Sequence, residues 1–571
     1  MKFTKQFLGV LLVMGATAWG QKGDPIGQIE LRVTDKYKAQ VGEATKYSDM
    51  PKFEDTTTTK LRVNYGINSQ PVPIHYKPEP ISAARIRIER VPQLYKGMVR
   101  AGYGLYNSPF LDVYWNSGRT SKMSYGFWGE HYSFSKGVKE TVYEKNGLSN
   151  NQLGGYYNRF YKNYSLRTKA FGKWDKYSYY GVDKLPNKSD SLGIPEVLGD
   201  PDFNWYRQYQ VEATLSERNA KDLGWLSDLS FIYYNFSDKI DSKENLVDLH
   251  SDWALPAGKY QLDLGLGINY FGTSFDSIVK GNQSYFTFLA NPSVSTTVKN
   301  MLFDFGFNLF LTSYKADWEI NSQGNGYFLP VIKMQIPFVQ DVITLKAGMK
   351  GDLKQNSYRQ ITKDNNYVVP GDTLKPTRNI DLYVGFHGIL SASTSFNLIG
   401  GITFNKDMAL YYRNPIYQRL DSMAVTHLDV RYSNNTSFYV RGELATNIKN
   451  NLQLNVFGEL RTFDVDTELE AWHMPGFTGG INVDYTIKEK LKLNSSWDFV
   501  GARTAFASDL NPDLDNELPA YLDVGLGAEY LFNTRLSAFL NVTNLLNNKY
   551  DMYLGYKAQS INFLMGFTYK L

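Results

Sequence analysis

One polar segment near the C-terminus carries oxygen-bearing side chains at alternate positions, as the start of a calcium loop does. Carboxylate and amide oxygens are the ligands that Ca²⁺ takes in proteins. Leu514 stands where such a loop needs its turn glycine, and Ala520 stands where it needs its final glutamate. We therefore expect an ordinary acidic loop with no assigned metal site. Its candidate ligands are Asp509, Asn511, Asp513, Asp515 and Glu517.

Residues that could support catalysis are scattered along the chain. The histidines show no H-x-x-x-H spacing, and no G-x-S-x-G nucleophile motif occurs. The absence of cysteine excludes disulfides and thiolate metal sites. The sequence therefore predicts no catalytic site and no cofactor, and we expect that the protein is not an enzyme. The histidines are His75, His131, His250, His387, His427 and His473.

The composition narrows the class of protein further. The chain has 571 residues and a net charge of +4, and 15% of its residues are aromatic. A charge this close to neutral gives no support for a nucleic-acid partner. No apolar run of about 20 residues occurs in the body of the chain, so the sequence predicts no membrane-spanning helix. The absence of such a run does not exclude a β-barrel, because half of the residues in each strand of a barrel face away from lipid and can be polar.

The first twenty residues have the pattern of a secretory signal peptide. Lys2 and Lys5 form a basic start, an apolar stretch covers residues 7–16, and Ala18-Trp19-Gly20 offers a small-residue cleavage site. This stretch is too short for a spanning helix. The alternative is an N-terminal core helix. We expect residues 1–20 to be removed and the mature protein to be exported into a Gram-negative envelope.

Residues 258–272 show what kind of element fills most of the chain. Side chains that leave a strand on opposite faces give a period of two. Eleven strand residues tilted by about 40° span roughly 25 Å, the height of the apolar band of a membrane barrel. Tyrosine settles at membrane–water boundaries, and here it stands at both ends of the row. The row expected to face lipid is Tyr260, Leu262, Leu264, Leu266, Ile268 and Tyr270.

This stretch alone leaves a lipid-facing strand and a large soluble β-sandwich both open. Short and long connections alternate from about residue 95 onward, which is typical of a barrel threaded from the periplasm. We expect short turns at 172–174, 255–257, 338–341, 488–489 and 532–534, and long loops at 136–153, 183–202, 353–377, 406–425 and 503–518. The pattern predicts an all-β, closed antiparallel transmembrane barrel of about 22 strands, since only a closed barrel or a helix satisfies its backbone in lipid.

The C-terminal segment carries a family resemblance. Residues 542–550 read VTNLLNNKY and precede a final strand that ends at Leu571. This segment resembles the end of TonB-dependent receptor barrels, and GMVRAGYGLY at residues 97–106 resembles their first strand. The resemblance implies a barrel over residues 95–571 in the cell outer membrane. It also implies an insertion signal, read by the barrel-insertion machinery, at Gly566, Phe567, Tyr569 and Leu571, although Leu571 stands where many such proteins carry Phe.

The N-terminal part departs from this family. Full receptors carry a much longer globular plug and a box that TonB grips, whereas residues 21–94 show neither pattern. Four prolines at 71, 73, 78 and 80 indicate an extended chain there. We therefore expect 21–94 to be a short segment that is periplasmic or partly lumenal.

These expectations lead to two classes of function. The first is a plugless, structural or accessory subunit of an outer-membrane transport or assembly complex. The alternative is a passive or partner-assisted conduit, or TonB-dependent uptake, for a solute. Charges of both signs on the expected inner face argue against a pore selective for one sign of ion. The expected partners are outer-membrane lipid and lipopolysaccharide, the insertion machinery and other envelope proteins, with no nucleic acid.

Overall fold

The computed structural model describes residues 95–571, except 119, 140, 142, 144, 182–202, 219–224, 277–279, 320–321, 370–372, 414–426, 450, 469 and 507–516. The expected signal peptide (1–20) and N-terminal segment (21–94) lie outside the described residues. None of the described helices is long and apolar enough to cross a membrane.

The described chain is built almost entirely of strands. The first part contains β1 (Gly97–Gly104), β2 (Ser108–Asn116), β3 (Met123–Phe134), β4 (Leu148–Phe160), β5 (Tyr164–Ser178), β6 (Phe203–Glu217), β7 (Leu226–Asp238), β8 (Lys243–Ala257), β9 (Tyr260–Asp276), β10 (Lys280–Val298), β11 (Met301–Ala316), β12 (Gln323–Val339) and β13 (Ile343–Lys354). The second part contains helix α2 (Tyr358–Asp364), β14 (Thr377–Ser391), β15 (Thr394–Tyr412), β16 (Asp429–Ile448), β17 (Leu452–Arg461), β18 (Asp464–Val465), β19 (Phe477–Ile487), β20 (Leu491–Val500), β21 (Arg503–Thr504), β22 (Glu517–Leu518), β23 (Tyr521–Leu531), β24 (Leu536–Thr543), β25 (Asp551–Tyr553), β26 (Tyr556–Lys557) and β27 (Asn562–Lys570).

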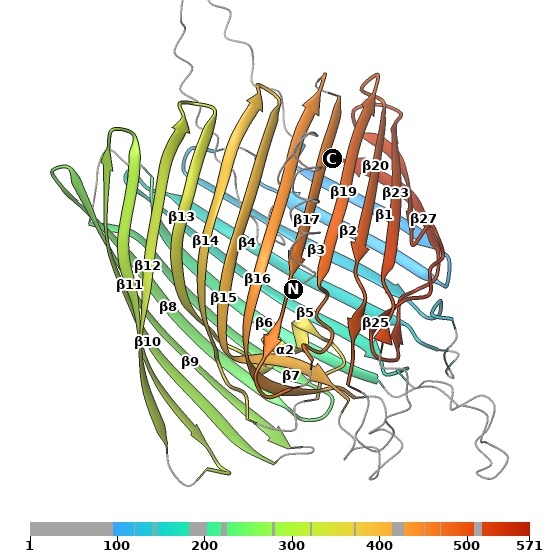
Figure 1. The fold of residues 1–571 in the computed structure, drawn as a ribbon. Coiled ribbons are helices and arrows are strands. Elements are labelled where there is room, and N and C mark those ends of the chain that lie inside the picture. The colour runs from blue at the N-terminus through green and yellow to red at the C-terminus, as the bar shows by residue number, and fades with distance from the viewer. Residues whose placement is uncertain are drawn as a thin grey trace, which may run out of the picture. The chain divides into compact units, whose positions relative to one another are not determined.

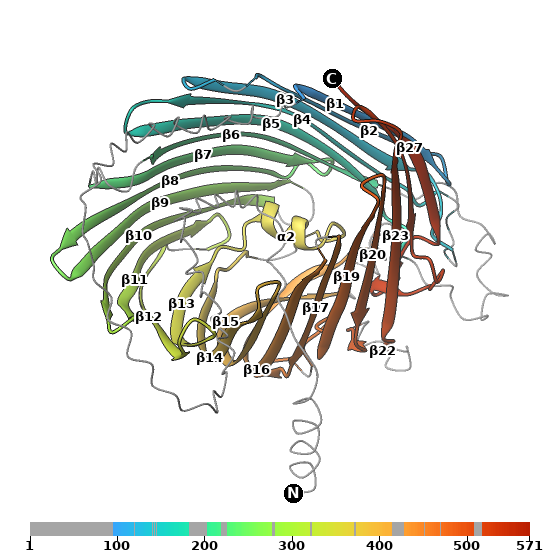
Figure 2. The same cartoon turned by 90° about the horizontal axis from the view of Figure 1, so that it is seen from above.

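The strands close into a single barrel. Each long strand pairs antiparallel with the next one along the chain, and β27 pairs with β1 to close the ring (Figures 1 and 2). The short β18 continues the line of β17, because both pair with β16, so the barrel has 22 strands. The predicted fold class is confirmed, and the predicted number of strands is right.

Strand β9 shows how the sequence sets the two faces of the wall. The row that starts at Tyr260 lies on one face of β9, and all of its members except Leu266 are exposed. On the other face, Phe271, Thr273 and Phe275 are buried. Exposed aliphatic and aromatic side chains on the outside, with a covered inside, are the arrangement of a membrane barrel.

Two segments that we expected to be turns are parts of strands. Residues 172–174 lie within β5, where Gly172 pairs with Leu153 and Tyr209. A side chain at 172 would collide with Trp174, since its Cβ would lie 2.6 Å from the indole, so this glycine makes room for a ring and does not mark a turn. Residues 255–257 end β8, and the turn follows at Gly258, whose φ is +66°.

Two expected loops are shorter than predicted. β4 already begins at Leu148, and β15 continues to Tyr412. In β15 the register shifts between Asn405 and Met408, and Asp407 has a φ of +56°. Such a bulge interrupts the period of two while the strand goes on. The polar residues at the bulge therefore mimic the start of a loop.

Candidate functional site

The largest buried cluster of the described residues lies at the end of the barrel that carries the long connections. We call it the cap cluster. Strands β6, β7, β9 and β16 contribute to it, as do the connections that follow β3, β5, β13, β15 and β24. Its members are Val138, Tyr179, Tyr180, Tyr206, Tyr234, Phe236, Phe275, Tyr358, Ile361, Tyr367, Val368, Leu374, Leu428, Val430 and Tyr556.

Helix α2 brings the connection between β13 and β14 into the ring of strands (Figure 2). Ser357 caps the helix, and its hydroxyl accepts a hydrogen bond from Gln360 N. Tyr358 is completely buried, with its ring 5.7 Å from that of Phe236 and 5.6 Å from that of Phe275. The helix therefore packs against the inner face of the wall and not above the rim.

Two buried carboxylates of the wall hold this helix in place. Glu244 on β8 accepts hydrogen bonds from Tyr358 N at 2.7 Å, from Thr273 Oγ1 at 2.9 Å and from Tyr234 OH at 2.7 Å. The Tyr358 hydroxyl donates to Asp238, the last residue of β7. Both carboxylates are almost completely buried. A buried charged group that loses its partners carries a large penalty, so these hydrogen bonds fix the helix firmly.

The rest of the same connection is fixed to other strands. Gln283 on β10 exchanges two hydrogen bonds with the backbone of Leu374, at 3.0 and 3.1 Å. The Trp318 indole donates to Thr373 Oγ1 at 2.8 Å, and Tyr206 OH donates to Asn366 O at 2.9 Å. The segment between β13 and β14 is thus attached to the wall at several separate points.

Other connections meet α2 and its flanking residues from different parts of the ring. The Tyr367 ring stacks on that of Tyr556, with centroids 3.6 Å apart, and joins the connection before β14 to the one before β27. Tyr180 donates to Lys557 O at 2.9 Å. Arg413 Nη2 donates to Gly181 O and to Leu554 O, at 2.7 and 3.1 Å. Since these connections start far apart around the ring, the cap cluster extends across the interior.

His473 ties one more connection to this assembly. Its Nδ1 lies 3.0 Å from Tyr411 O, and its Nε2 lies 3.2 Å from Leu554 N. Because an amide N–H only donates, Nε2 accepts and the ring is neutral, with its proton on Nδ1. The pKa of His473 is lowered to about 4, mainly by burial. The hydrogen bond to Tyr411 O raises the pKa, and the positive charges of Arg503 and Arg413 lower it.

The inner face of the wall carries paired charges. Lys173 and Asp175 lie 2.7 Å apart, and so do Arg461 and Glu459. Arg441 lies 2.6 Å from Glu443. These pairs bring together charges of both signs, as the sequence predicted for the inner face. The arrangement offers no field of one sign to attract a particular ion.

Of the five predicted metal candidates, the structure describes one. Asp509, Asn511, Asp513 and Asp515 lie outside the described residues, and Glu517 is an exposed residue at the start of β22. No three His, Asp or Glu side chains within the described part of the chain are grouped as metal ligands. Among the described insertion-signal residues, Phe567, Tyr569 and Leu571 are exposed at the C-terminal end, and Gly566 pairs with Gly102.

None of the residues of the cap cluster was predicted from the sequence. A usable signal existed, because Tyr358, Ile361, Tyr367 and Val368 stand in a connection that is otherwise polar. Apolar side chains in a connection of this length indicate that it folds back onto the protein. Glu244 and Asp238 carry no such signal, since a charged residue on a strand looks the same whether a loop covers it or not.

No protein-family model matches this sequence, and no curated protein sequence matches it. Solved structures do match. The FrpB iron transporter from Neisseria meningitidis aligns with a TM-score of 0.65 and 11% identity, covering 84% of this chain and 82% of that one. The siderophore receptor PirA from Acinetobacter baumannii aligns with a TM-score of 0.62 and 13% identity over 85% and 81% of the two chains.

A third similar structure is the pyoverdine outer-membrane receptor FpvA from Pseudomonas aeruginosa PAO1. It aligns with a TM-score of 0.61 and 12% identity over 85% of this chain and 79% of that one. These neighbours are transporters and receptors, not enzymes, and at such identities they show a common fold. The predicted outer-membrane location agrees with that fold. The described barrel therefore has the 22-strand fold of TonB-dependent outer-membrane receptors, as the C-terminal motif predicted.

Proposed function

We propose that this chain is a closed, plugless outer-membrane barrel that serves as a structural or accessory subunit of a transport or assembly complex. The observation that carries the proposal is the cap cluster, which crosses the interior at the end with the long connections. A barrel closed by its own loops retains a large, rigid wall for contacts with lipid and with envelope proteins, and gives up free passage of solutes.

The hydrogen bonds around α2 support a cap that stays shut without a ligand. Tyr358 N, Tyr234 OH and Thr273 Oγ1 all donate to Glu244, and each of these groups is buried. Moving α2 out of the barrel would take the Tyr358 N–H away from Glu244 and the Tyr358 hydroxyl away from Asp238, whereas Tyr234 and Thr273 stay in place on β7 and β9. Losing a hydrogen bond to a buried charged group costs about 1.5–3 kcal/mol, and two such losses keep an open state rare.

Channel recordings on the purified full chain in planar bilayers test the closed state. We expect no steady conductance from the wild-type protein. The double variant E244A/Y358A should show frequent large openings, because it removes both the carboxylate and the ring that hold α2. A matched double variant on the outer wall, L153A/L249A, replaces two exposed side chains and should stay closed.

A large steady conductance of the wild-type protein would overturn the proposal and favour the conduit. The subunit role has its own test. Mild-detergent purification from native membranes should recover the chain in a defined complex with other envelope proteins. Recovery of the isolated chain alone, together with uptake of a solute by vesicles that contain it, would contradict the subunit role even if the recordings showed a closed barrel.

A further inference from the structure

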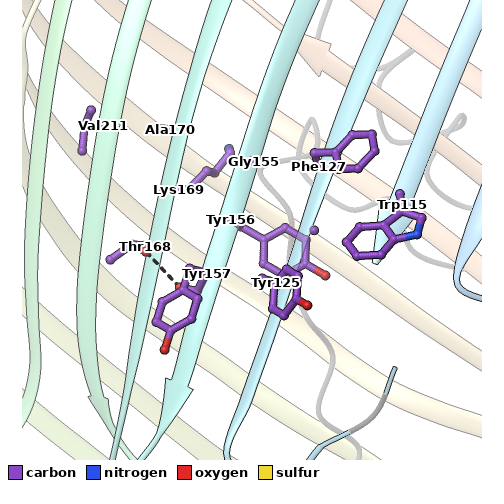
Figure 3. Close-up of a pocket in the computed structure, with 11 residues that line it drawn as sticks. Trp115, Tyr125, Phe127, Gly155, Tyr156, Tyr157, Thr168, Lys169, Ala170 and Val211 are labelled. Atoms are coloured by element: carbon purple, nitrogen blue, oxygen red, sulfur yellow. Dashed lines mark hydrogen bonds between the residues drawn. The ribbon is translucent and has the colours of Figure 1, made fainter. Parts of the chain in front are cut away.

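A groove on the outward face of the wall is separate from the cap cluster. It lies over β2 to β6 and encloses about 400 Å³ (Figure 3). Phe127 on β3 faces Gly155 on β4, which faces Ala170 on β5, and Val211 on β6 follows in the same row. Phe127 and Val211 are exposed, so this row belongs to the side of the wall that carries the exposed apolar residues.

Two small residues between large ones create the groove. A Cβ at Gly155 would meet one close atom, Gly126 O at 3.3 Å, so the space above Gly155 is open. Trp115 and Phe127, whose rings stack with centroids 5.5 Å apart, form one side. Tyr125 and Tyr157 lie one row nearer the short-turn rim. The floor is therefore lower than the aromatic walls around it.

The lining of the groove is apolar. A polar side-chain group in this lining is the hydroxyl of Thr168, which donates a hydrogen bond to Tyr157 O at 2.9 Å. This intramolecular hydrogen bond leaves the hydroxyl proton unavailable to a ligand. A groove with aromatic walls and a satisfied hydroxyl suits a hydrocarbon chain and not a sugar or a peptide backbone, which need polar partners.

Basic side chains lie just beyond the groove, toward the short-turn rim. Arg159 follows Tyr157 on the same face of β4, about 7 Å further along the strand. Its guanidinium lies 6.0 Å from the centre of the Tyr161 ring, and no carboxylate of the described residues forms an ion pair with it. The exposed Lys122 lies in the adjoining short turn, where its backbone O accepts a hydrogen bond from Phe160 N at 2.9 Å, so its side chain starts close to the end of β4.

The whole short-turn rim shares this positive charge. The acidic residues of the described short turns are Asp341 and Glu489. The basic residues of the same turns are Lys122, Lys162, Arg218, Lys259, Lys299, Lys449, Lys488, Lys490 and Arg535. Each Lys or Arg near a membrane surface favours an anionic lipid by about 1 kcal/mol. The rim is therefore suited to a leaflet that contains anionic headgroups.

We propose that the groove is a binding site for an anionic glycerophospholipid of the leaflet at the short-turn rim. One acyl chain lies over Gly155 and Ala170 between the aromatic walls, and the phosphate lies near Arg159 and Lys122. Toward the rim, the apolar groove is followed by tyrosines and then by cations. This order matches that of a lipid, which runs from an apolar acyl chain to a charged headgroup. The inference rests on the membrane location of the wall and does not depend on the proposed subunit role.

Native mass spectrometry of the full chain in detergent, with phosphatidylglycerol or phosphatidylethanolamine added, tests this site. The wild-type protein should retain phosphatidylglycerol at least about fivefold better than phosphatidylethanolamine, because one rim cation favours an anionic lipid by about 1 kcal/mol. Ala170→Phe fills the groove and should lose most of the retained lipid. Ala347→Phe is the matched control, because Ala347 lies beside the exposed Val384 on the outer face of β13.

The charge is tested separately. The double variant R159Q/K122Q should bind the two lipids equally, whereas K299Q/K488Q, at other turns of the same rim, should keep the preference. Equal lipid retention by A170F and A347F would overturn the proposal, as would equal binding of the two lipids by the wild-type protein. A photo-crosslinker at position 170 that captures a protein in native membranes instead of lipid would also overturn it.

Discussion

The wall and the cap cluster of this barrel are stabilised in different ways. In the wall, each strand pairs with its neighbours in the chain, and the alternation of apolar and polar residues decides which face each side chain takes. In the cap cluster, side chains from five connections and four strands meet although they are far apart in the sequence. The wall is thus specified locally and repeatedly, whereas the cap depends on a few long-range contacts.

Charged residues illustrate the same difference. Lys350 and Asp352 form an ion pair of 3.6 Å on β13, but their side chains are 61% and 49% exposed, so the pair contributes little. Glu244 is completely buried and receives its hydrogen bonds from three elements. Single substitutions should therefore be tolerated across most of the wall and poorly tolerated in the cap.

The largest expected effect is at Tyr358. Y358A removes a completely buried ring together with the hydroxyl that donates to Asp238. The expected cost is about 3–5 kcal/mol in the free energy of opening the cap. Hydrogen exchange of the α2 amides measures this cost directly, and those amides should exchange much faster in the variant.

The control for Tyr358 is Y161A, which truncates a tyrosine that is 51% exposed in a short turn. This variant should leave α2 exchange unchanged. If both variants changed α2 exchange equally, the cap would not be held by its own buried contacts, and the distinction between cap and wall would fail.

A second variant tests the face of the wall that we expect to meet lipid. Leu264 lies in the middle of the exposed row on β9, and the adjacent Asp263 points to the opposite face. L264R should cost about 2–4 kcal/mol in the free energy of unfolding in lipid vesicles, or should block insertion. D263N should change little. Equal tolerance at the two positions would remove the assigned orientation of the strand.

Much of the wall could be predicted from the sequence because its rule is local. The row from Tyr260 to Tyr270 needs only the period of two and the position of tyrosine, and the structure places it on one face of β9. The same rule fails where one residue departs from it. Gly172 and the bulge beside Asp407 both look like the end of a strand, and contacts with Trp174 and β16 decide otherwise.

The cap could not be predicted by the same rule. Nothing in the sequence near Glu244 indicates that Tyr358 N lies 2.7 Å away, since the two residues are distant in the chain. The stacking of Tyr367 on Tyr556 joins two connections whose relative position follows from closure of the whole ring. Such contacts become visible only when the strand order and the register of the barrel are known.

The smallest expected effect is a pH dependence of the cap at His473. Its pKa is about 4 in the folded protein, below the value of about 6.5 for an exposed histidine. Between these two values the opened state binds more protons than the closed state, so the closed cap loses stability as the pH falls. Linkage gives a loss of about 2 kcal/mol at pH 5 relative to neutral pH. Hydrogen exchange of the Leu554 amide, which donates to His473 Nε2, measures it.

The matched variant is H473Q, whose side chain keeps an acceptor and a donor but does not titrate in this range. In H473Q the protection of the Leu554 amide should not change between pH 7 and pH 5, after correction for intrinsic exchange. A wild-type cap that is equally protected at both values would mean that the opening that exposes the Leu554 amide does not release His473 to bind a proton. In that case the contact between His473 and Leu554 would not hold this part of the cap closed.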